Sequence, residues 1–531
     1  MFFHLGMQRY NKKRTCANFI CNNRTKNCKH AFFFVLLRLI LVRSNMNRMR
    51  RNILIGILCA VCGLSAWAQD STKVAKRQAV KSHLQQHFKP YGFIRNYFTY
   101  DSRESMSGTG DLYNYQPYDE SWNQTNDPAL REDLNATSTF RFLSLTTRVG
   151  VDIVGYTWRD TEFGAKIEAD FYAALSGTGH KLNGDAQFRL RQAYLTLGWD
   201  SLKMGKDYAR VDLLLGQAWH PMAADLSDVL SLNSGAPFGP FSRTPQVKMD
   251  ARLGRYITLT GALLWQMKYT SMGPNGSSAE YIMYSKTPEA YLGLSVHDKG
   301  FLMRAGANVL SICPRHIGSM LDDNLNTVLG TDGLPLLVKV SDRITTVSPF
   351  IYLQYKKGEF SIKAKSILAE AGEHMNMNGG YGVHAIHSGG GYSYTPTRTS
   401  STWLSIVYGG KVGAQEDKHP QKLQGILFAG YIRNFGTKES LYDPNNDGVI
   451  DAGEITQYYY YPRVPNMNRM WRLTPTLLYT VGRFQIGLEY EITSVHYGDM
   501  TKGLNAKNGL ADSSKHWVTN HRVQLITKFN F

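Results

Sequence analysis

The feature that most constrains this chain is an alternation of apolar and polar residues that runs from Tyr91 to the last residue, Phe531. One stretch places an apolar set and a charged set at alternate positions: Phe163, Ala165, Ile167, Ala169 and Phe171 against Lys166, Glu168 and Asp170. Successive side chains of a β-strand point to opposite faces, so the pattern predicts strands with one apolar and one polar face. No stretch of eighteen uncharged apolar residues occurs, and we expect no membrane-spanning helix.

The connections between these strands predict the kind of sheet. Tight turns at 254–256, 298–300, 357–359 and 482–483 alternate with long polar segments at 101–139, 220–243, 312–346, 370–401 and 436–469. Short periplasmic turns and long extracellular loops are typical of a transmembrane antiparallel β-barrel. We therefore predict an all-β fold of about 16 strands, near 91–100, 140–154, 162–174, 187–199, 211–219, 244–253, 257–266, 290–297, 301–311, 347–356, 360–369, 402–408, 424–435, 470–481, 484–497 and 517–530. Connections 200–210 and 409–423 are longer than expected for the periplasmic side, where the turns are tight. The predicted number of strands could therefore be off by two.

The first 68 residues predict export. A basic stretch before residue 52, an apolar run at 53–64 and the sequence Ala66-Trp67-Ala68 match a signal peptide that is cleaved before Gln69. We assign 46–68 to this signal peptide, 69–90 to a short periplasmic segment and 91–531 to the barrel. Because segment 1–45 precedes the signal, we predict that translation starts at Met46 or Met49. The alternative is a second membrane anchor within 1–45.

The net charge of +18 would suggest a nucleic-acid partner, but its distribution argues against one. Residues 1–68 hold twelve Lys and Arg and no Asp or Glu, which leaves 48 basic against 42 acidic residues in the rest. We expect no nucleic-acid binding. Only one of the six cysteines, Cys313, follows the leader, so the mature chain has no internal disulfide.

The last strand and the aromatic residues indicate insertion into an outer membrane. Val523, Leu525 and Phe529 share one face with the terminal Phe531, which resembles the signal read by the barrel-assembly machinery. An ordinary amphipathic strand is the alternative. Aromatic residues near strand ends would form girdles against lipid and lipopolysaccharide: Tyr97, Tyr100, Trp199, Trp219, Trp265, Trp471 and Trp517.

One loop carries a specific metal motif. Segment 443–454 fits the pattern D-x-[DN]-x-[DN]-G-x5-E and resembles the calcium loop of EF-hands. The predicted Ca2+ ligands are side-chain oxygens and, at Val449, the carbonyl: Asp443, Asn445, Asp447, Val449, Asp451 and Glu454. Flanks at 432–435 and 458–461 look like strands, so we expect no helix pair and a structural role for the ion. A turn without an ion is the alternative.

The sequence offers no catalytic motif. GxSxG, HExxH and phosphate-binding loops are missing, and we predict that the protein is not an enzyme. Loop 374–394 carries His374, His384 and His387, for which a solvated loop is a simpler interpretation than a metal site.

Two neighbouring motifs carry a family resemblance. The run Phe188-Arg189-Leu190-Arg191-Gln192-Ala193-Tyr194 is followed by Leu214-Leu215-Gly216-Gln217-Ala218-Trp219. This pair resembles the DcaP-like porins. The resemblance implies a homotrimer of sixteen-stranded barrels in a Gram-negative outer membrane, which passes small and often anionic solutes. The long helical N-terminal extension of that family is here at most residues 71–89.

Basic residues recur on the polar faces of the predicted strands. A charge on the lipid face costs about 2–4 kcal/mol at mid-bilayer, so these residues should line the lumen, where Lys and Arg favour anions. Arg189 and Arg191 match the family motif and are the first choice, although Ala193, Leu195 and Leu197 share their phase. The other expected pore-lining residues are basic strand residues and two aspartates of loop 220–243: Arg148, Lys166, Lys248, Arg252, Arg304, Asp225 and Asp228.

Loop 220–243 is the third long loop of this topology, and in classical porins that loop folds inward. We expect Asp225 and Asp228 to face the basic wall across a constriction; an ordinary surface loop is the alternative. The basic residues could instead pair with lumenal carboxylates and give a weakly selective pore: Asp170, Asp250, Glu489 and Glu491.

Three functions fit these observations. The one we favour is a porin for passive diffusion of small hydrophilic, anionic solutes. The second is a plugged barrel that acts in binding or adhesion through its long loops. The third is an outer-membrane hydrolase, which would need a Ser-His pair on the outer face of the barrel.

Overall fold

The computed structural model describes residues 86–108, 113–144, 146–175, 182–204, 207–231, 235–413, 419–461 and 463–531. All of them belong to one compact unit, His83–Phe531. The predicted upstream segment 1–45, the signal peptide 46–68 and most of the segment 69–90 lie outside the described residues. No helix in the described ranges is long and apolar enough to cross a membrane.

The first and last strands of the barrel close one antiparallel sheet into a ring. Strand β1 (Phe88–Asp101) pairs on one side with β25 (His516–Asn530). On its other side it pairs with β4 (Thr139–Leu143) and then with β5 (Arg148–Trp158), which share one position in the barrel. Closure leaves no sheet edge with unpaired backbone groups. Such pairing is required because hydrocarbon offers no water to bind backbone amides and carbonyls.

The other strands of the ring follow in chain order, and the closed barrel has 16 strands, as predicted. They are β6 (Thr161–Leu175), β7 (Leu182–Met204), β8 (Asp207–Trp219), β9 (Arg243–Leu253), β10 (Ile257–Leu264), β11 (Glu289–Asp298), β12 (Phe301–Ile312), β15 (Ile344–Lys357), β16 (Phe360–Glu370), β18 (Tyr392–Val412), β19 (Gln421–Thr437), β22 (Met467–Val481) and β23 (Phe484–Tyr497).

The two connections that looked too long for the short side are shorter than the sequence suggested. Strands β7 and β8 extend the hairpin to Met204 and Asp207, and β18 and β19 extend theirs to Val412 and Gln421. The alternation fades in these strand ends, which carry Gly and Lys, and the sequence therefore placed the boundaries too early. With these two hairpins complete, the barrel has sixteen strands and not two more or two fewer.

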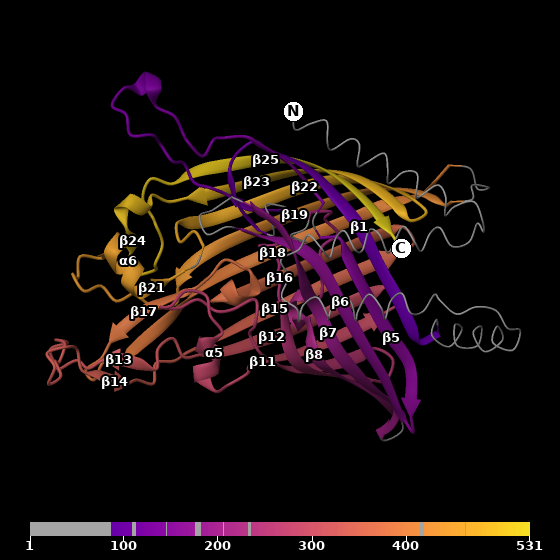
Figure 1. Cartoon of the computed structure of the whole chain (residues 1–531), viewed down its shortest axis with the longest axis horizontal. Coiled ribbons are helices and arrows are strands. Elements are labelled where there is room, and N and C mark those ends of the chain that lie inside the picture. Colours follow the sequence, from indigo (N-terminus) through magenta and orange to yellow (C-terminus); the bar gives the residue numbers. More distant parts are fainter. Residues whose placement is uncertain are drawn as a thin grey trace, which may run out of the picture. The chain divides into compact units, whose positions relative to one another are not determined.

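The long connections carry short elements of their own. They are β2 (Ser105–Gly108), β3 (Tyr113–Pro117), η1 (Pro128–Leu130), η2 (Pro221–Ala223), α5 (Glu280–Ser285), β13 (Ile317–Ser319), β14 (Leu337–Lys339), η3 (Gly372–Met375), β17 (Tyr381–Ile386), β20 (Val449–Ile450), α6 (Ala452–Tyr458), β21 (Tyr459–Tyr460), η4 (Met500–Lys502) and β24 (Leu504–Asn505). Those labelled in Figure 1 (α5, β13, β14, β17, α6, β21 and β24) gather at the end of the barrel away from the tight turns.

The two faces of the barrel wall differ as the alternation predicts. Outward residues such as Ile167 and Leu488 are each 51% exposed, whereas Asp170 and Glu489 on the inner face are buried. The prediction that aromatic residues near strand ends lie in the girdles is wrong for Tyr97 and Trp219. Tyr97 is fully buried within the barrel, and Trp219 lies in the lumen, because each falls on the inward phase of its strand.

The closing seam between β1 and β25 depends on a small residue. A Cβ atom at Gly92 would lie 2.5 Å from the Phe531 ring and 2.6 Å from the Arg148 carbonyl oxygen. Gly261, in the middle of β10, has no atom within 4 Å of the same position.

We therefore predict that Gly92→Leu weakens closure, whereas Gly261→Leu leaves the barrel intact. The measurement is heat-modifiable migration on an SDS gel, with the folded band of the Gly92 variant lost at a lower temperature. Equal stability of the two variants would contradict this view of the seam.

Candidate functional site

The connection between β8 and β9, residues 220–242, lies inside the barrel and is called the inner loop below. Its described parts are 220–231 and 235–242, and Met222, Ala223 and Phe238 are fully buried. Wall side chains hold its backbone. Lys365 donates to the Met222 carbonyl, Ser401 Oγ donates to Phe238 O at 2.7 Å, and Arg472 Nη1 donates to Ala236 O at 3.0 Å.

The acidic residues of the inner loop pair directly with the wall. Asp225 lies 2.6 Å from Arg304, and Asp228 lies 2.7 Å from Lys363. Both aspartates were expected to face basic wall residues across a constriction, and in the structure they contact such residues directly. Glu489 also accepts hydrogen bonds from the Leu230 and Ser231 amides at 2.6 and 3.0 Å. These contacts fasten the inner loop to one half of the barrel, from β12 to β23.

A pocket of about 200 Å³ remains between the inner loop and the other half of the wall. We call it the cationic pocket. Strand side chains line one side: Phe93, Arg95, Arg148, Arg189, Arg191, Trp219 and Lys528. The inner loop lines the other side: Leu226, Val229, Leu230, Ser231 and Phe241.

The predicted pore residues Arg189 and Arg191 lie in this pocket but are ion-paired. Asp170 is 2.6 Å from each of them, and Glu168 is 2.8 Å from Arg191. Two carboxylates thus serve both arginines. Pairing of the lumenal basic residues with carboxylates such as Asp170 is the alternative expected from the sequence, and both arginines form such a pair.

Three other cations of the pocket are less well compensated. Arg148 is 3.6 Å from Glu168, and its Nε has no hydrogen-bond partner among the described residues. Among the described residues, Arg95 and Lys528 form no ion pair, and their contacts are with a hydroxyl group and aromatic rings. Arg95 donates to Thr146 Oγ1 at 3.0 Å, and Lys528 lies 4.5 Å from the centre of the Phe93 ring. Five cations against two carboxylates leave the pocket positive.

A β-bulge explains the unclear phase of Arg189 and Arg191. The register of β6 with β7 shifts so that Glu168 and Ala169 pair with Gln192 and Leu190, which leaves Arg191 as the extra residue. Before the bulge Leu190 points outward, and after it Leu195 does. A bulge can re-aim a side chain in this way, and here it keeps both arginines in the lumen.

The other predicted pore-lining cations lie away from the cationic pocket. A second hollow of about 410 Å³, the mixed chamber, is lined by Lys248, Asp250, Arg252 and Arg304 among others. Within it Lys248 pairs with Asp250 at 2.6 Å. Lys166 pairs with Asp152 at 3.0 Å. Both lysines are thus paired with a carboxylate.

Sequence reasoning missed Arg95 and Lys528. A usable signal existed, since Lys528 alternates with the outward Phe529 of the final strand and Arg95 alternates with the outward Ile94. We interpreted the final strand only as a sorting signal. Trp219 was assigned to a girdle because it ends its strand.

A buried cluster ties the inner loop to η3. His220 Nε2 and His374 Nε2 lie 3.0 and 3.1 Å from the same oxygen, Oε1 of Glu289, and Asn308 donates to it at 2.7 Å. His374 Nδ1 also faces the carbonyl of Ala371 at 3.2 Å. Both nitrogens of His374 face acceptors, an arrangement that favours the doubly protonated, positively charged ring. His374 is therefore buried in an ion pair and not in a solvated loop.

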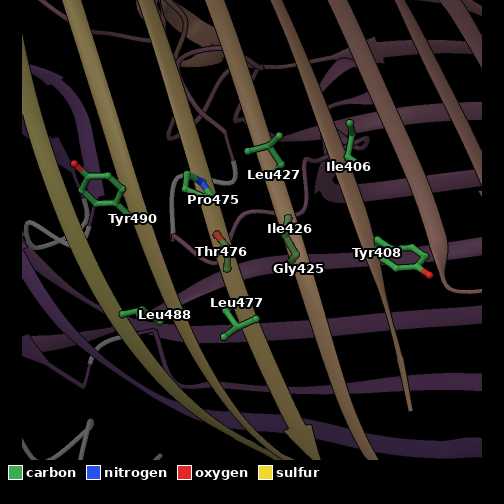
Figure 2. Close-up of a pocket in the computed structure, with 10 residues that line it drawn as sticks. All are labelled: Ile406, Tyr408, Gly425, Ile426, Leu427, Pro475, Thr476, Leu477, Leu488 and Tyr490. Carbon is green, nitrogen blue, oxygen red and sulfur yellow. The ribbon is translucent and has the colours of Figure 1, made fainter. Parts of the chain in front are cut away.

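A hollow of about 640 Å³ lies on the outer wall over β18, β19, β22 and β23 (Figure 2). Its lining is apolar, with Leu427, Leu477 and Leu488 pointing out from neighbouring strands. This surface is part of the face that contacts hydrocarbon, and it shares no side chain with the cationic pocket.

The segment 443–454 adopts a turn followed by a helix. Gly448 has φ 85°, β20 pairs with β24, and α6 begins at Ala452 within the motif. The flank predicted as a strand at 458–461 contains β21, and no helix pair encloses the loop among the described residues. The single helix α6 was not expected; it begins at the end of the motif because Asp451 and Glu454 form a capping box.

The acidic side chains of this loop bind local partners. Both Asp443 oxygens accept backbone N–H groups, and Glu454 Oε1 accepts from Asn445 at 2.8 Å. Among the described residues, no three His, Cys, Asp or Glu side chains are arranged to hold a metal ion.

The closed ring, the apolar exterior and the inner loop together define an outer-membrane β-barrel of the porin architecture. No family model and no curated protein matches the sequence. The structure is similar to the outer membrane channel DcaP of Acinetobacter baumannii, with a TM-score of 0.50, 15% identity, and coverage of 84% of this chain and 97% of that one. This likeness shows the fold.

Two further solved structures are similar at lower scores. The anion-selective porin from Comamonas acidovorans has a TM-score of 0.41 and 11% identity, with 84% and 99% of the two chains covered. OprB of Pseudomonas putida has a TM-score of 0.40 and 10% identity, with 86% and 97% covered.

The His374 cluster predicts a pH dependence. Burial opposes the charged ring, but the Glu289 carboxylate outweighs it and raises the pKa of His374. Burial also raises the pKa of the neighbouring Glu373 to about 7. Both groups bind protons more tightly in the folded state, so their stabilising effect is present at acidic pH and is lost as pH rises through these pKa values.

We expect the unfolding temperature to fall between about pH 5 and pH 8. The double variant Glu373→Gln/His374→Gln should flatten this dependence. His384→Gln, which changes a partly exposed histidine outside this cluster, is the matched control and should retain it. A flat wild-type profile would contradict the prediction.

Proposed function

We propose that this protein is a porin of a Gram-negative outer membrane, through which small hydrophilic anions diffuse passively. The observation that carries the proposal is the cationic pocket beside the inner loop, where five basic side chains face two carboxylates. Basic residues at a constriction raise the local concentration of anions and repel cations.

The position of the inner loop supports permeation over the rival functions. The loop is fastened to one half of the wall, and hollows of about 200 and 410 Å³ border it. A plugged barrel for adhesion would hold no conducting path along these hollows. Conductance of the purified protein separates the two, and a lipase assay tests the hydrolase.

The assembly that we propose is a homotrimer. Such a barrel would contact outer-membrane lipid and lipopolysaccharide and would depend on the barrel-assembly machinery for insertion. Conductance that appears in steps of three would support the trimer.

We predict that the double variant Arg95→Gln/Lys528→Gln lowers the anion preference of the channel. A unit charge about 4 Å from a permeating ion contributes ~1 kcal/mol in water, so the anion-to-cation permeability ratio should fall by at least fivefold. The measurement is the reversal potential in a planar bilayer under a KCl gradient.

Lys166→Gln is the matched control, because it also removes a lumenal charge but lies outside the cationic pocket. It should change the ratio less than the double variant. A wild-type channel that prefers cations, or no conductance at all, would sink the porin proposal.

We also propose that the loop 443–454 binds one Ca2+ in a structural role. The support is the residue pattern together with the left-handed Gly448 and the helix α6 at the end of the loop. The ion would be held by Asp443, Asn445, Asp447, the Val449 carbonyl, Asp451 and Glu454, and Asn445 and Glu454 would first separate.

We expect isothermal titration to show one Ca2+ per chain, lost in Asp443→Ala/Asp447→Ala. The control is Asp332→Ala, which removes a carboxylate from another exposed turn. If the wild-type protein produces no heat of binding with CaCl2, the loop holds no calcium.

A further inference from the structure

The face that the inner loop turns toward the cationic pocket is uncharged. It consists of Leu226, Val229, Leu230, Ser231 and Phe241. The carboxylates of the same loop lie elsewhere, because Asp225 and Asp228 are bound to Arg304 and Lys363. A solute in the pocket therefore meets basic side chains on one side and an apolar surface on the other.

Aromatic rings extend this apolar surface onto the strand side. Phe93 and Trp219 line the pocket, and Phe241 lies edge-on to Trp219 with 5.2 Å between the ring centres. The guanidinium of Arg243 lies 4.8 Å from the centre of the Trp219 ring. The rings thus stand next to the cations that would bind an anionic group.

The basic side has hydrogen-bonding capacity to spare. Arg148 Nε is buried without a partner among the described residues, and Arg95 and Lys528 form no ion pair within the same ranges. A bound oxyanion would satisfy these donors through charge-assisted hydrogen bonds. The body of the same solute would then lie against Leu226 and Val229.

We propose that the cationic pocket selects organic anions with an apolar or aromatic body over equally charged anions with a polar body. The inference rests on the proposed function, since it presumes a conducting, anion-preferring channel. Its physical basis is the combination of charge on one wall with removal of apolar solute surface from water on the other.

The test compares two anions that share a six-membered ring and a single carboxylate. Cyclohexanecarboxylate has an apolar ring, and glucuronate has a hydroxylated ring. Their permeabilities relative to chloride are measured as bi-ionic reversal potentials of the full-length protein in planar bilayers at neutral pH. We expect cyclohexanecarboxylate to permeate about fourfold better, the factor that burial of one methylene group contributes.

The variant Leu226→Asn/Val229→Thr makes the inner-loop face polar with little change of size, so it separates polarity from the larger size of glucuronate. We expect the ratio of the two anions to fall toward one. Leu302→Asn, which makes the same kind of change in the mixed chamber, is the control and should keep the wild-type ratio. If the double variant does not insert, Val229→Thr alone replaces it.

A wild-type ratio of one or less would overturn the inference, and so would a ratio that the double variant leaves unchanged. Either result with an intact preference for chloride over potassium leaves the porin proposal standing. Loss of conductance or a preference for potassium in the wild-type protein would instead refute the porin proposal itself.

Discussion

The pairing of every backbone amide and carbonyl around a closed ring is the constraint on which this structure depends. A strand in hydrocarbon has no water to bind, so β1 must pair with β25 and with β4 and β5 at once. Closure then divides the side chains into an outer apolar set and an inner polar set. The absence of a side chain at Gly92 is a local condition for that closure, because the Phe531 ring occupies the space.

Within the ring, the placement of the inner loop decides what the lumen can do. The loop gives its carboxylates and backbone carbonyls to one half of the wall, and it buries Phe238 against Phe428 in a cluster that includes Trp403. The cationic pocket on the other side of the loop keeps five cations beside two carboxylates. The position of the loop therefore leaves this positive pocket open on one side of the lumen.

Much of the fold was predictable because period-two alternation reports directly on a wall with lipid outside and water inside. All sixteen strand positions were found, but several boundaries were wrong. Strand β18 begins at Tyr392 and not at 402, the predicted strand 140–154 is divided into β4 and β5, and some strand ends that carry Gly and Lys were placed too early. The site was less predictable. The inward direction of Arg191 depends on a β-bulge, which the sequence pattern does not reveal. Trp219 lies at a strand end, as girdle aromatics do, so its place in the lumen could not be predicted. The helix α6 was missed because its capping box overlaps the metal motif.

The sequence by itself determined that the chain forms a barrel of about sixteen strands and which strand face points inward. These properties depend on local alternation and on loop length, which are local in the chain. Only the tertiary structure decided that Asp170 serves two arginines, that Asp225 lies on Arg304, and that Arg95 and Lys528 meet in one pocket. Arg95 and Lys528 lie more than four hundred residues apart in sequence, and closure of the ring alone brings them together.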